Sequence, residues 1–245
     1  MNSSPPVKSI EFVNIFPHRV FDSGVCWNII AVCFRIIREQ MSLSEVLMDL
    51  MKNMILSEGK IIGTDILKVD SFLNHQIDPQ IMEEIGKAFA EKFAGAGITK
   101  VLTLESSGIA PALFTAHCLG VPAVFARKTT SRNLDSDTYI STVHSFTKGT
   151  DYVIRVSKRY LAESDVILLI DDFLARGCAL KGLIDIVGQS GAKLAGAGIV
   201  IEKGFQEGGA LIRSMGIRVH SLAIVKEMSE KENRITFEDE NNSQE

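Results

Sequence analysis

The stretch Val166-Ile-Leu-Leu-Ile-Asp-Asp-Phe-Leu-Ala-Arg-Gly-Cys-Ala179 decides the fold class. Its first five residues are apolar, which is typical of a strand buried on both faces of a parallel sheet. Asp171 and Asp172 follow at the carboxyl end of that strand, where open parallel sheets bind their ligands. Small residues then let a loop and a helix start close on a bound group, and amides at a helix start attract phosphate. The stretch predicts an anion-binding edge of a parallel sheet.

The rest of the chain alternates between short apolar strands and helices. Asp78 and Pro79 supply the N-cap and the first-turn proline of one helix, which two glycines, Gly95 and Gly97, bring to an end. We expect further helices at 43–56, 109–119, 179–189 and 207–215, and strands at 101–104, 123–126, 152–156, 166–170, 195–201 and 218–223. This order implies right-handed crossovers, and it predicts an α/β fold with a mainly parallel twisted sheet flanked by helices.

Length and charge limit the number of domains and the class of partner. The chain has 245 residues and a formal net charge of −4, so one substantial core is possible and no broad basic field can hold nucleic acid. The four cysteines lack the spacing of a zinc site, which favours a reducing cytoplasm. The apolar run 25–37 is too short to span a membrane. We expect a poorly ordered extension at 1–40, the folded domain at 41–226 and a charged tail at 227–245 that frays.

The acidic stretch resembles the motif with which type I phosphoribosyltransferases bind 5-phosphoribosyl 1-pyrophosphate (PRPP). In that family a hydrophobic strand runs into two acidic residues and a small-residue loop. The similarity covers residues 41 to 237, and it is closest to the bacterial xanthine phosphoribosyltransferases in four segments. They are Val-Asp-Ser-Phe-Leu-Asn-His-Gln-Ile-Asp-Pro at 69–79, Glu-Ser-Ser-Gly-Ile-Ala-Pro-Ala at 105–112, Val-Phe-Ala-Arg-Lys at 124–128 and Gly-Ile-Val-Ile-Glu-Lys at 198–203.

The resemblance implies the type I phosphoribosyltransferase fold, with a flexible active-site loop at 128–150 and a small base-binding hood near 60–78. It implies an enzyme of purine salvage that converts xanthine and PRPP to xanthosine 5′-monophosphate and pyrophosphate. Magnesium would be carried by PRPP rather than by a set of protein ligands, because magnesium prefers phosphate oxygens to an all-protein cage. A homodimer is also implied.

The same resemblance assigns candidate residues for PRPP. As catalytic groups it implies Asp171 and Asp172, which would contact the ribose hydroxyls, with Arg127 and Lys128, which would stabilise the departing pyrophosphate. The 5-phosphate would lie in the loop of Ala175, Arg176, Gly177, Cys178 and Ala179. The pyrophosphate would face Glu105, Ser106, Ser107 and Gly108, whose small side chains precede a helix start and suit an anion.

For the purine base, the resemblance implies Leu67, Asn74, Lys203 and Phe205. Asn74 and Lys203 have N–H groups that can donate to carbonyl oxygens of the base, and Phe205 can stack on it. The chain departs from the family pattern at Arg176 and Cys178, where the xanthine branch usually has Asn and Gln, and at Gly204, where it usually has serine. Side-chain contacts to the phosphate therefore stay open.

Other interpretations remain open at this point. Acidic pairs after buried strands also occur in metal sites and phosphorelay receivers, and basic doublets are usually solvated surface pairs. A PRPP-sensing transcriptional regulator could share the fold, but residues 1–48 hold few cations and no helix-turn-helix pattern. An inactive subunit with an altered phosphate loop and an enzyme for another purine base are the remaining alternatives.

Overall fold

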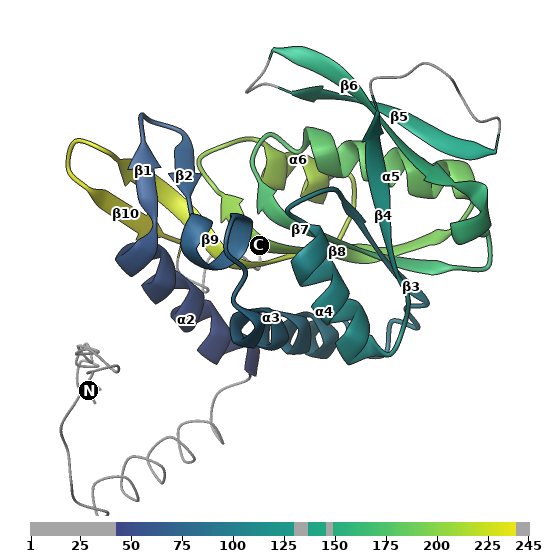
Figure 1. The fold of residues 1–245 in the computed structure, drawn as a ribbon, viewed down its shortest axis with the longest axis horizontal. Coiled ribbons are helices and arrows are strands. Elements are labelled where there is room, and N and C mark those ends of the chain that lie inside the picture. The colour runs from purple at the N-terminus through teal and green to yellow at the C-terminus, as the bar shows by residue number, and fades with distance from the viewer. Residues whose placement is uncertain (1–42, 130–136, 146–148, 239–245) are drawn as a thin grey trace, which may run out of the picture. The chain divides into compact units, whose positions relative to one another are not determined.

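The computed structural model of the chain describes residues 43–129, 137–145 and 149–238. The predicted extension at 1–40 lies outside these ranges. Within them, an eight-stranded sheet has the strand order β10-β9-β8-β7-β3-β4-β6-β5, and helices cover both of its faces (Figure 1). Two further strands form a separate small sheet, β1-β2.

The centre of the large sheet is parallel and its two edges are antiparallel. The parallel strands are β9 (Val219–Ser229), β8 (Lys193–Lys203), β7 (Val166–Leu174), β3 (Lys100–Leu104) and β4 (Ala123–Thr129). The antiparallel strands are β10 (Arg234–Phe237) at one edge, and β6 (Thr150–Ser157) and β5 (Thr138–Ser145) at the other. The predicted α/β class with a mainly parallel sheet is confirmed.

Strand β7 lies at the centre of the sheet, and its side chains alternate between two cores. Ile167 and Leu169 pack in the core beneath α5 (Cys178–Ser190), which also receives Ile212 of α6 (Gly208–Ser214). Leu168 and Ile170 face the other core, formed with α2 (Leu43–Glu58), α3 (Pro79–Lys92) and α4 (Ile109–Leu119). All four β7 side chains are fully buried, so the predicted strand with two buried faces is confirmed.

The start of α3 follows the predicted capping pattern. The Asp78 carboxylate accepts hydrogen bonds from the backbone N–H groups of Gln80 and Ile81, at 2.9 and 3.4 Å. Pro79 occupies the first helical position, where its missing N–H costs no hydrogen bond. Gly86 in the middle of α3 meets the backbone of α4, because a β-carbon there would lie 2.6 Å from the Phe114 carbonyl. The two helices therefore pack closely below the sheet.

The predicted hood is a hairpin of β1 (Lys60–Ile62) and β2 (Ile66–Lys68), followed by a π-helical turn, η1 (Asp70–Asn74). Leu67 and Phe72 are buried in the core shared with α2 and α3, which ties the hood to the domain. The turn of the hairpin is bonded to the neighbouring turn between β9 and β10, since the Gly63 N–H donates to the Glu230 carboxylate at 2.7 Å. In Figure 1 the hood stands beside β10, above α2.

One strand, β5, occurs in a segment that the sequence predicted to be an irregular loop. The polar segment 128–150 contains β5, whose Ser141 and Val143 are buried against α5. Gly182 permits this contact, because a β-carbon there would lie 2.6 Å from a methyl group of Val143. Residues 130–136 and 146–148 of the same segment lie outside the described residues. The segment is therefore not a continuous loop.

The expectation that the chain frays after Lys226 is wrong as far as Phe237. Strand β9 continues to Ser229, and β10 pairs with it antiparallel. Ile235 and Phe237 pack against the core below the sheet, so the apolar side chains of this short strand are partly covered. The rest of the predicted tail, 239–245, lies outside the described residues.

Candidate active site

The acidic pair lies at the carboxyl end of β7, as the sequence predicts. Asp171 and Asp172 are only 7% and 6% exposed. The Asp172 N–H donates to the Asp171 carboxylate at 3.1 Å, and the Asn74 side-chain amide donates to the Asp172 carboxylate at 3.1 Å. Burial raises the pKa of Asp171 well above its usual value, and the neighbouring charge of Asp172 raises it further. The pair therefore favours a cationic or hydrogen-bonding ligand.

A cavity of about 550 Å³ opens at this edge of the sheet. Its floor is the end of β7 with the following loop, residues 171–180 except Asp172, and its walls come from three other places. These are Asp65 and Ile66 of the hood, Val143, His144 and Tyr152 of the β5–β6 hairpin, and Lys203 at the end of β8 with Gln206 after it. A volume of this size can hold a small organic ligand.

The loop between β7 and α5 leads directly into a helix start, and its residues line the cavity. Gly177 has a φ of 78°, the left-handed conformation that glycine adopts without strain, and α5 begins at the next residue, Cys178. The first turn of a helix directs backbone N–H groups without helical partners toward its open end. Arg176 is exposed and its guanidinium lies 3.7 Å from the Glu207 carboxylate. Arg176, Gly177 and Cys178 all line the cavity, so both the side chain of Arg176 and the backbone of the loop lie at its floor.

The loop 105–108 lies against the acidic pair. A β-carbon at Gly108 would be 3.0 Å from a carboxylate oxygen of Asp171 and 2.2 Å from the Thr103 hydroxyl, so only glycine fits. The Glu105 carboxylate accepts a hydrogen bond from the Lys128 backbone N–H at 2.6 Å. Glu105 thereby joins the loop to β4. Ser106 and Ser107 belong to the same turn, which leads directly into α4.

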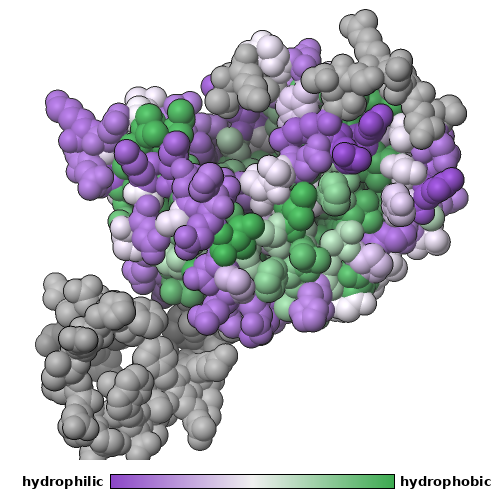
Figure 2. All heavy atoms as spheres, viewed as in Figure 1, coloured by the Kyte–Doolittle hydropathy of each residue, from purple (hydrophilic) through white to green (hydrophobic). Residues whose placement is uncertain are grey.

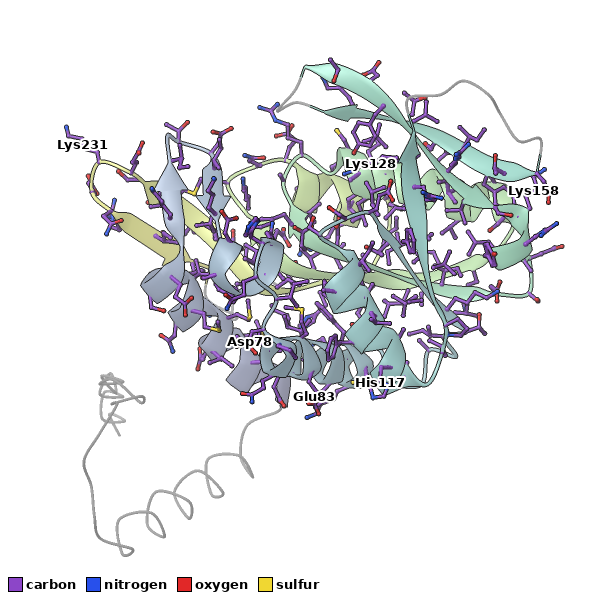
Figure 3. All side chains as sticks on the ribbon, viewed as in Figure 1. Asp78, Glu83, His117, Lys128, Lys158 and Lys231 are labelled. Atoms are coloured by element: carbon purple, nitrogen blue, oxygen red, sulfur yellow. The ribbon has the colours of Figure 1, made fainter. Side chains whose placement is uncertain are left out.

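The two cations near the end of β4 point in different directions. Lys128 lies on the same face of β4 as the buried Ala126, with its ammonium 5.5 Å from the centre of the Tyr152 ring, and its charge lowers the pKa of Asp171 by a minor amount. Arg127 lies on the opposite face together with Phe125, which is 44% exposed. In Figure 3, Lys128 lies near the upper end of β4, far from Glu83 and His117 on the helices below. The structure brings only Lys128 to the acidic pair.

Of the base-site candidates, Lys203 lines the cavity, whereas Asn74 donates to Asp172, the residue that follows the lining residue Asp171. Lys203 also donates to the Asp65 carbonyl of the hood and lies 5.7 Å from the centre of the Phe173 ring. Its burial lowers the pKa of the ammonium group. Leu67 instead belongs to the core beneath the hood. Among the described residues, Phe205 is not part of the cavity lining, and Phe173 presents its ring there.

Comparison with known proteins identifies the family. A model of the phosphoribosyl transferase domain matches residues 70–214. This chain belongs to the phosphoribosyltransferase family. It is 57% identical over 190 residues to the xanthine phosphoribosyltransferase of Ruminiclostridium cellulolyticum, covering 78% of this chain and 99% of that protein. With the xanthine phosphoribosyltransferase of Pseudomonas aeruginosa it is 55% identical over 182 residues, or 74% of this chain and 96% of the relative.

Solved structures of the family are similar in fold. The adenine phosphoribosyltransferase of Rhodothermus marinus superposes with a TM-score of 0.59 at 22% identity, over 72% of this chain and 97% of that one. The adenine phosphoribosyltransferase of Giardia lamblia gives a TM-score of 0.52 at 26% identity, over 59% of this chain and 79% of that one. The fold predicted from the resemblance is therefore confirmed.

The structure adds a residue to the candidate site that the sequence did not single out. Tyr152 of β6 lines the cavity, and burial raises the pKa of its phenol, with smaller contributions from Asp171 and Cys178. A tyrosine in a strand has no distinguishing sequence signal. Its position depends on the pairing of β6 with β4, which aligns Tyr152 beside Lys128 only in the folded chain.

The altered positions of the loops have structural partners. Gly204 follows β8, and a β-carbon there would lie 2.6 Å from the Glu238 carboxylate and 2.8 Å from an Ile224 methyl group. A serine at 204 would therefore require the side chains of Glu238 and Ile224 to shift. For Arg176, the exposed contact with Glu207 contributes little, because exposed ion pairs are worth at most about 1 kcal/mol.

Neither a multidentate metal site nor a membrane segment occurs in the part of the chain that the structure describes. No group of three or more His, Cys, Asp or Glu side chains gathers there to hold a metal ion. The described helices include none that is long and apolar enough to cross a membrane.

Proposed function

We propose that this chain is a xanthine phosphoribosyltransferase, which transfers the phosphoribosyl group of PRPP to xanthine and releases pyrophosphate. The observation that carries the proposal is the buried acidic pair at the rim of a cavity whose floor is a small-residue loop and helix start. The identity of more than half of the aligned residues with proteins named xanthine phosphoribosyltransferase supports the choice of base.

For PRPP, the arrangement supports binding of the ribose, the 5-phosphate and the pyrophosphate by different residues at the carboxyl ends of the strands. Asp171 and Asp172 accept hydrogen bonds from the ribose hydroxyls, while the backbone of 175–179 binds the 5-phosphate. Lys128, on the Asp171 side, supplies positive charge to the pyrophosphate as the bond to C1 breaks. Substitution at a sugar carbon passes through an oxocarbenium-like state. Alignment of the two substrates and exclusion of water then suffice, and no covalent nucleophile is needed.

The oxygen donors of the site fit magnesium bound mainly by PRPP. Only the two carboxylates of Asp171 and Asp172 lie together there, and the described residues offer no third acidic or imidazole ligand beside them. Magnesium commonly takes one or two carboxylates and completes its shell with phosphates and water. Bound with PRPP, the ion would neutralise charge on the pyrophosphate. The two aspartates would then hold the ribose side of that complex.

For the base, Asn74 and Lys203 support recognition of carbonyl oxygens. One N–H of the Asn74 amide reaches Asp172, and an amide has a second N–H donor. The Lys203 ammonium is held by the hood carbonyl of Asp65 at the cavity wall, where it can turn toward a base oxygen. A donor directed at the C2 carbonyl of xanthine would face the amino group of guanine. The site should therefore reject guanine.

Steady-state kinetics with four bases test this function. With PRPP and magnesium, we expect kcat/KM for xanthine to exceed that for guanine by at least about a hundredfold, because an unpaired buried polar group discriminates strongly. Hypoxanthine and adenine, which lack the C2 oxygen, should also react poorly, and turnover should require magnesium. Equal use of xanthine and guanine would contradict the base assignment. Binding of PRPP without transfer to any base would instead favour a sensor or an inactive subunit.

A homodimer is the second part of the proposal. Apolar side chains gather on the face over α4 and β4 (Figure 2), where Leu113 is 55% and Phe125 is 44% exposed. A second copy of the chain would cover this patch. Light scattering should give twice the mass of one chain, and Leu113→Glu should shift the mass toward the monomer. An unchanged dimer in L113E would place the contact elsewhere.

A further inference from the structure

A buried ion pair near the end of β8 lies outside the residues considered so far. The Glu202 carboxylate is on a residue only 3% exposed, and it accepts two hydrogen bonds from the guanidinium of Arg213, at 2.7 and 2.8 Å. The Ser221 hydroxyl of β9 donates to the same carboxylate. We call these three residues the Glu202 cluster. Both oxygens of the buried carboxylate are therefore bonded, as a stable buried charge requires.

The Glu202 cluster fixes α6 in place. Arg213 lies in the last turn of that helix, which has only seven residues and cannot be stable alone. Gly209, in the first turn, lies directly on the carboxylate, because a β-carbon there would be 1.8 Å from an oxygen of Glu202. The helix is thus attached to Glu202 at both of its ends.

The start of α6 also contacts the phosphate loop. The Gly208 N–H donates to the Ala175 carbonyl at 3.0 Å. A β-carbon at Gly208 would lie 2.2 Å from that carbonyl oxygen and 2.6 Å from the backbone nitrogen of Gly177. The backbones of helix and loop are therefore in direct contact. A shift of α6 would move the loop that we assign to the 5-phosphate.

Glu202 has a second connection, to the base side of the cavity. The next residue of β8 is Lys203, which lines the cavity and contacts the hood. In the sheet, Glu202 pairs with Leu174 of β7, the residue just before the phosphate loop. One buried carboxylate thus lies between the strand ends that carry the two proposed substrate subsites.

We propose that Glu202, Arg213 and Ser221 are positioning residues, which hold α6 against the phosphate loop and thereby set the affinity for PRPP. The inference rests on the proposed function for its choice of substrate. The Glu202 cluster contacts neither substrate, and it acts through Gly208 and the backbone of residues 175–177. Misplacement of a binding group by about 1 Å can cost up to about a hundredfold in rate. A variant of the cluster should therefore lose PRPP affinity, which a loss of stability alone would not produce.

A matched control lies at the amino ends of the central strands, the end of the sheet away from the cavity. Lys100 and Asp165 form another largely buried pair, 2.6 Å apart, with side chains 23% and 10% exposed. Asp165 also accepts from the Thr99 hydroxyl and the Ala162 N–H, so it is bonded as fully as Glu202. It lies at the amino end of β7, away from the cavity. Asp165→Asn should destabilise the domain without moving the phosphate loop.

The experiment compares E202Q, R213K and S221A with D165N. For each variant we would measure the melting temperature, the dissociation constant of PRPP with magnesium by calorimetry, and kcat and KM for PRPP and xanthine. We expect E202Q to weaken PRPP binding by about five- to twentyfold with a smaller change in kcat, and R213K and S221A to have effects of the same kind but smaller. D165N should lower the melting temperature about as much as E202Q does and leave PRPP affinity within about twofold of wild type.

Equal PRPP affinity in E202Q and wild type would overturn the inference, and so would an equal loss in E202Q and D165N. If E202Q does not fold, R213K and S221A decide the matter by the same comparison, because they preserve the buried carboxylate. Calorimetry uses PRPP without a base. It therefore tests the Glu202 cluster even if xanthine proves not to be the acceptor, which the kinetic assay of the wild-type protein reports separately.

Discussion

The two sides of the cavity are built in different ways. On the sheet side, Asp171 and Asp172 are less than one-tenth exposed, the Asp172 N–H donates to Asp171, and the Asp172 carboxylate accepts from Asn74. On the side of the β5–β6 hairpin, the contacts are single and more exposed, such as Lys128 over the Tyr152 ring. Buried bonded groups have one arrangement, whereas exposed contacts of about 0.5–1 kcal/mol can be exchanged for a ligand. The sheet side is thus preorganised, and the facing side can adapt.

This difference predicts the largest effect for the acidic pair. Asp171→Asn or Asp172→Asn keeps the size of the side chain and removes a charge that we assign to ribose and magnesium. We expect kcat/KM to fall by about 10²–10³-fold, the range typical of a lost preorganised electrostatic contact. Exposed Asp185 on α5 provides the control, since D185N should leave the kinetics unchanged. Wild-type kinetics in both D171N and D172N would place the site elsewhere.

Stability should change in the opposite direction from activity. The pKa of Asp171 is raised in the folded chain, so its ionised form is less stable there than in the unfolded chain. Its contribution to stability is therefore complete below the unfolded pKa and is lost as the pH rises through the folded pKa. Ligand-free D171N should melt at a higher temperature than wild type at neutral pH, and the difference should shrink in acid. A lower melting temperature for D171N at neutral pH would contradict the preorganised picture of the sheet side.

The adaptable side predicts a smaller effect at Tyr152. Tyr152→Leu removes the ring beneath the Lys128 ammonium, and kcat/KM should fall by about two- to fivefold, the equivalent of one exposed cation–π contact. Tyr152→Phe keeps the ring and should retain the activity. Tyr139 carries the same kind of contact with Lys158, at 5.7 Å, at the far end of the hairpin (Figure 3). Y139L should be silent, and an equal loss in Y139L and Y152L would refute a local role for the Lys128 contact.

Local signals were sufficient for the centre of the fold. Helix α4 has the predicted limits, 109–119, because Gly120 ends it in the left-handed conformation. The apolar run before Asp171 gives β7, although the strand continues to Leu174. Both features depend on residues close together in the sequence. The small-residue loop that follows β7 also depends on adjacent residues, and it is part of the motif that resembles the family.

Long-range partners explain what the sequence could not predict. Strand β5 is largely polar and β10 has only four residues, and both are strands because β6 and β9 pair with them. Arg127 and Lys128 are adjacent in sequence, yet only pairing in the sheet determines which of them lies beside Tyr152. Glu202 resembles any acidic residue at the end of a strand until Arg213 and Ser221 are folded against it. Assignments of single side chains to substrate atoms stay predictions.

The smallest effect on activity is expected at Thr103. Its hydroxyl is buried near the acidic pair but, unlike the two carboxylates, has no hydrogen-bond partner among the described residues. The residue is 1% exposed, and its oxygen touches Gly108. A buried hydroxyl without a partner costs free energy, so Thr103→Val should increase the free energy of unfolding by about 1 kcal/mol.

Thr115 is the matched control, because its buried hydroxyl donates to the Pro111 carbonyl at 2.7 Å. T115V should lose about 1 kcal/mol. Urea unfolding of both variants measures the difference. The kcat/KM of T103V should stay within about twofold of wild type, because Thr103 does not line the cavity. A large loss of activity in T103V, with the gain in stability intact, would mean that this hydroxyl bonds the acidic pair when PRPP is bound, and the sheet side would then be less preorganised than the folded chain indicates.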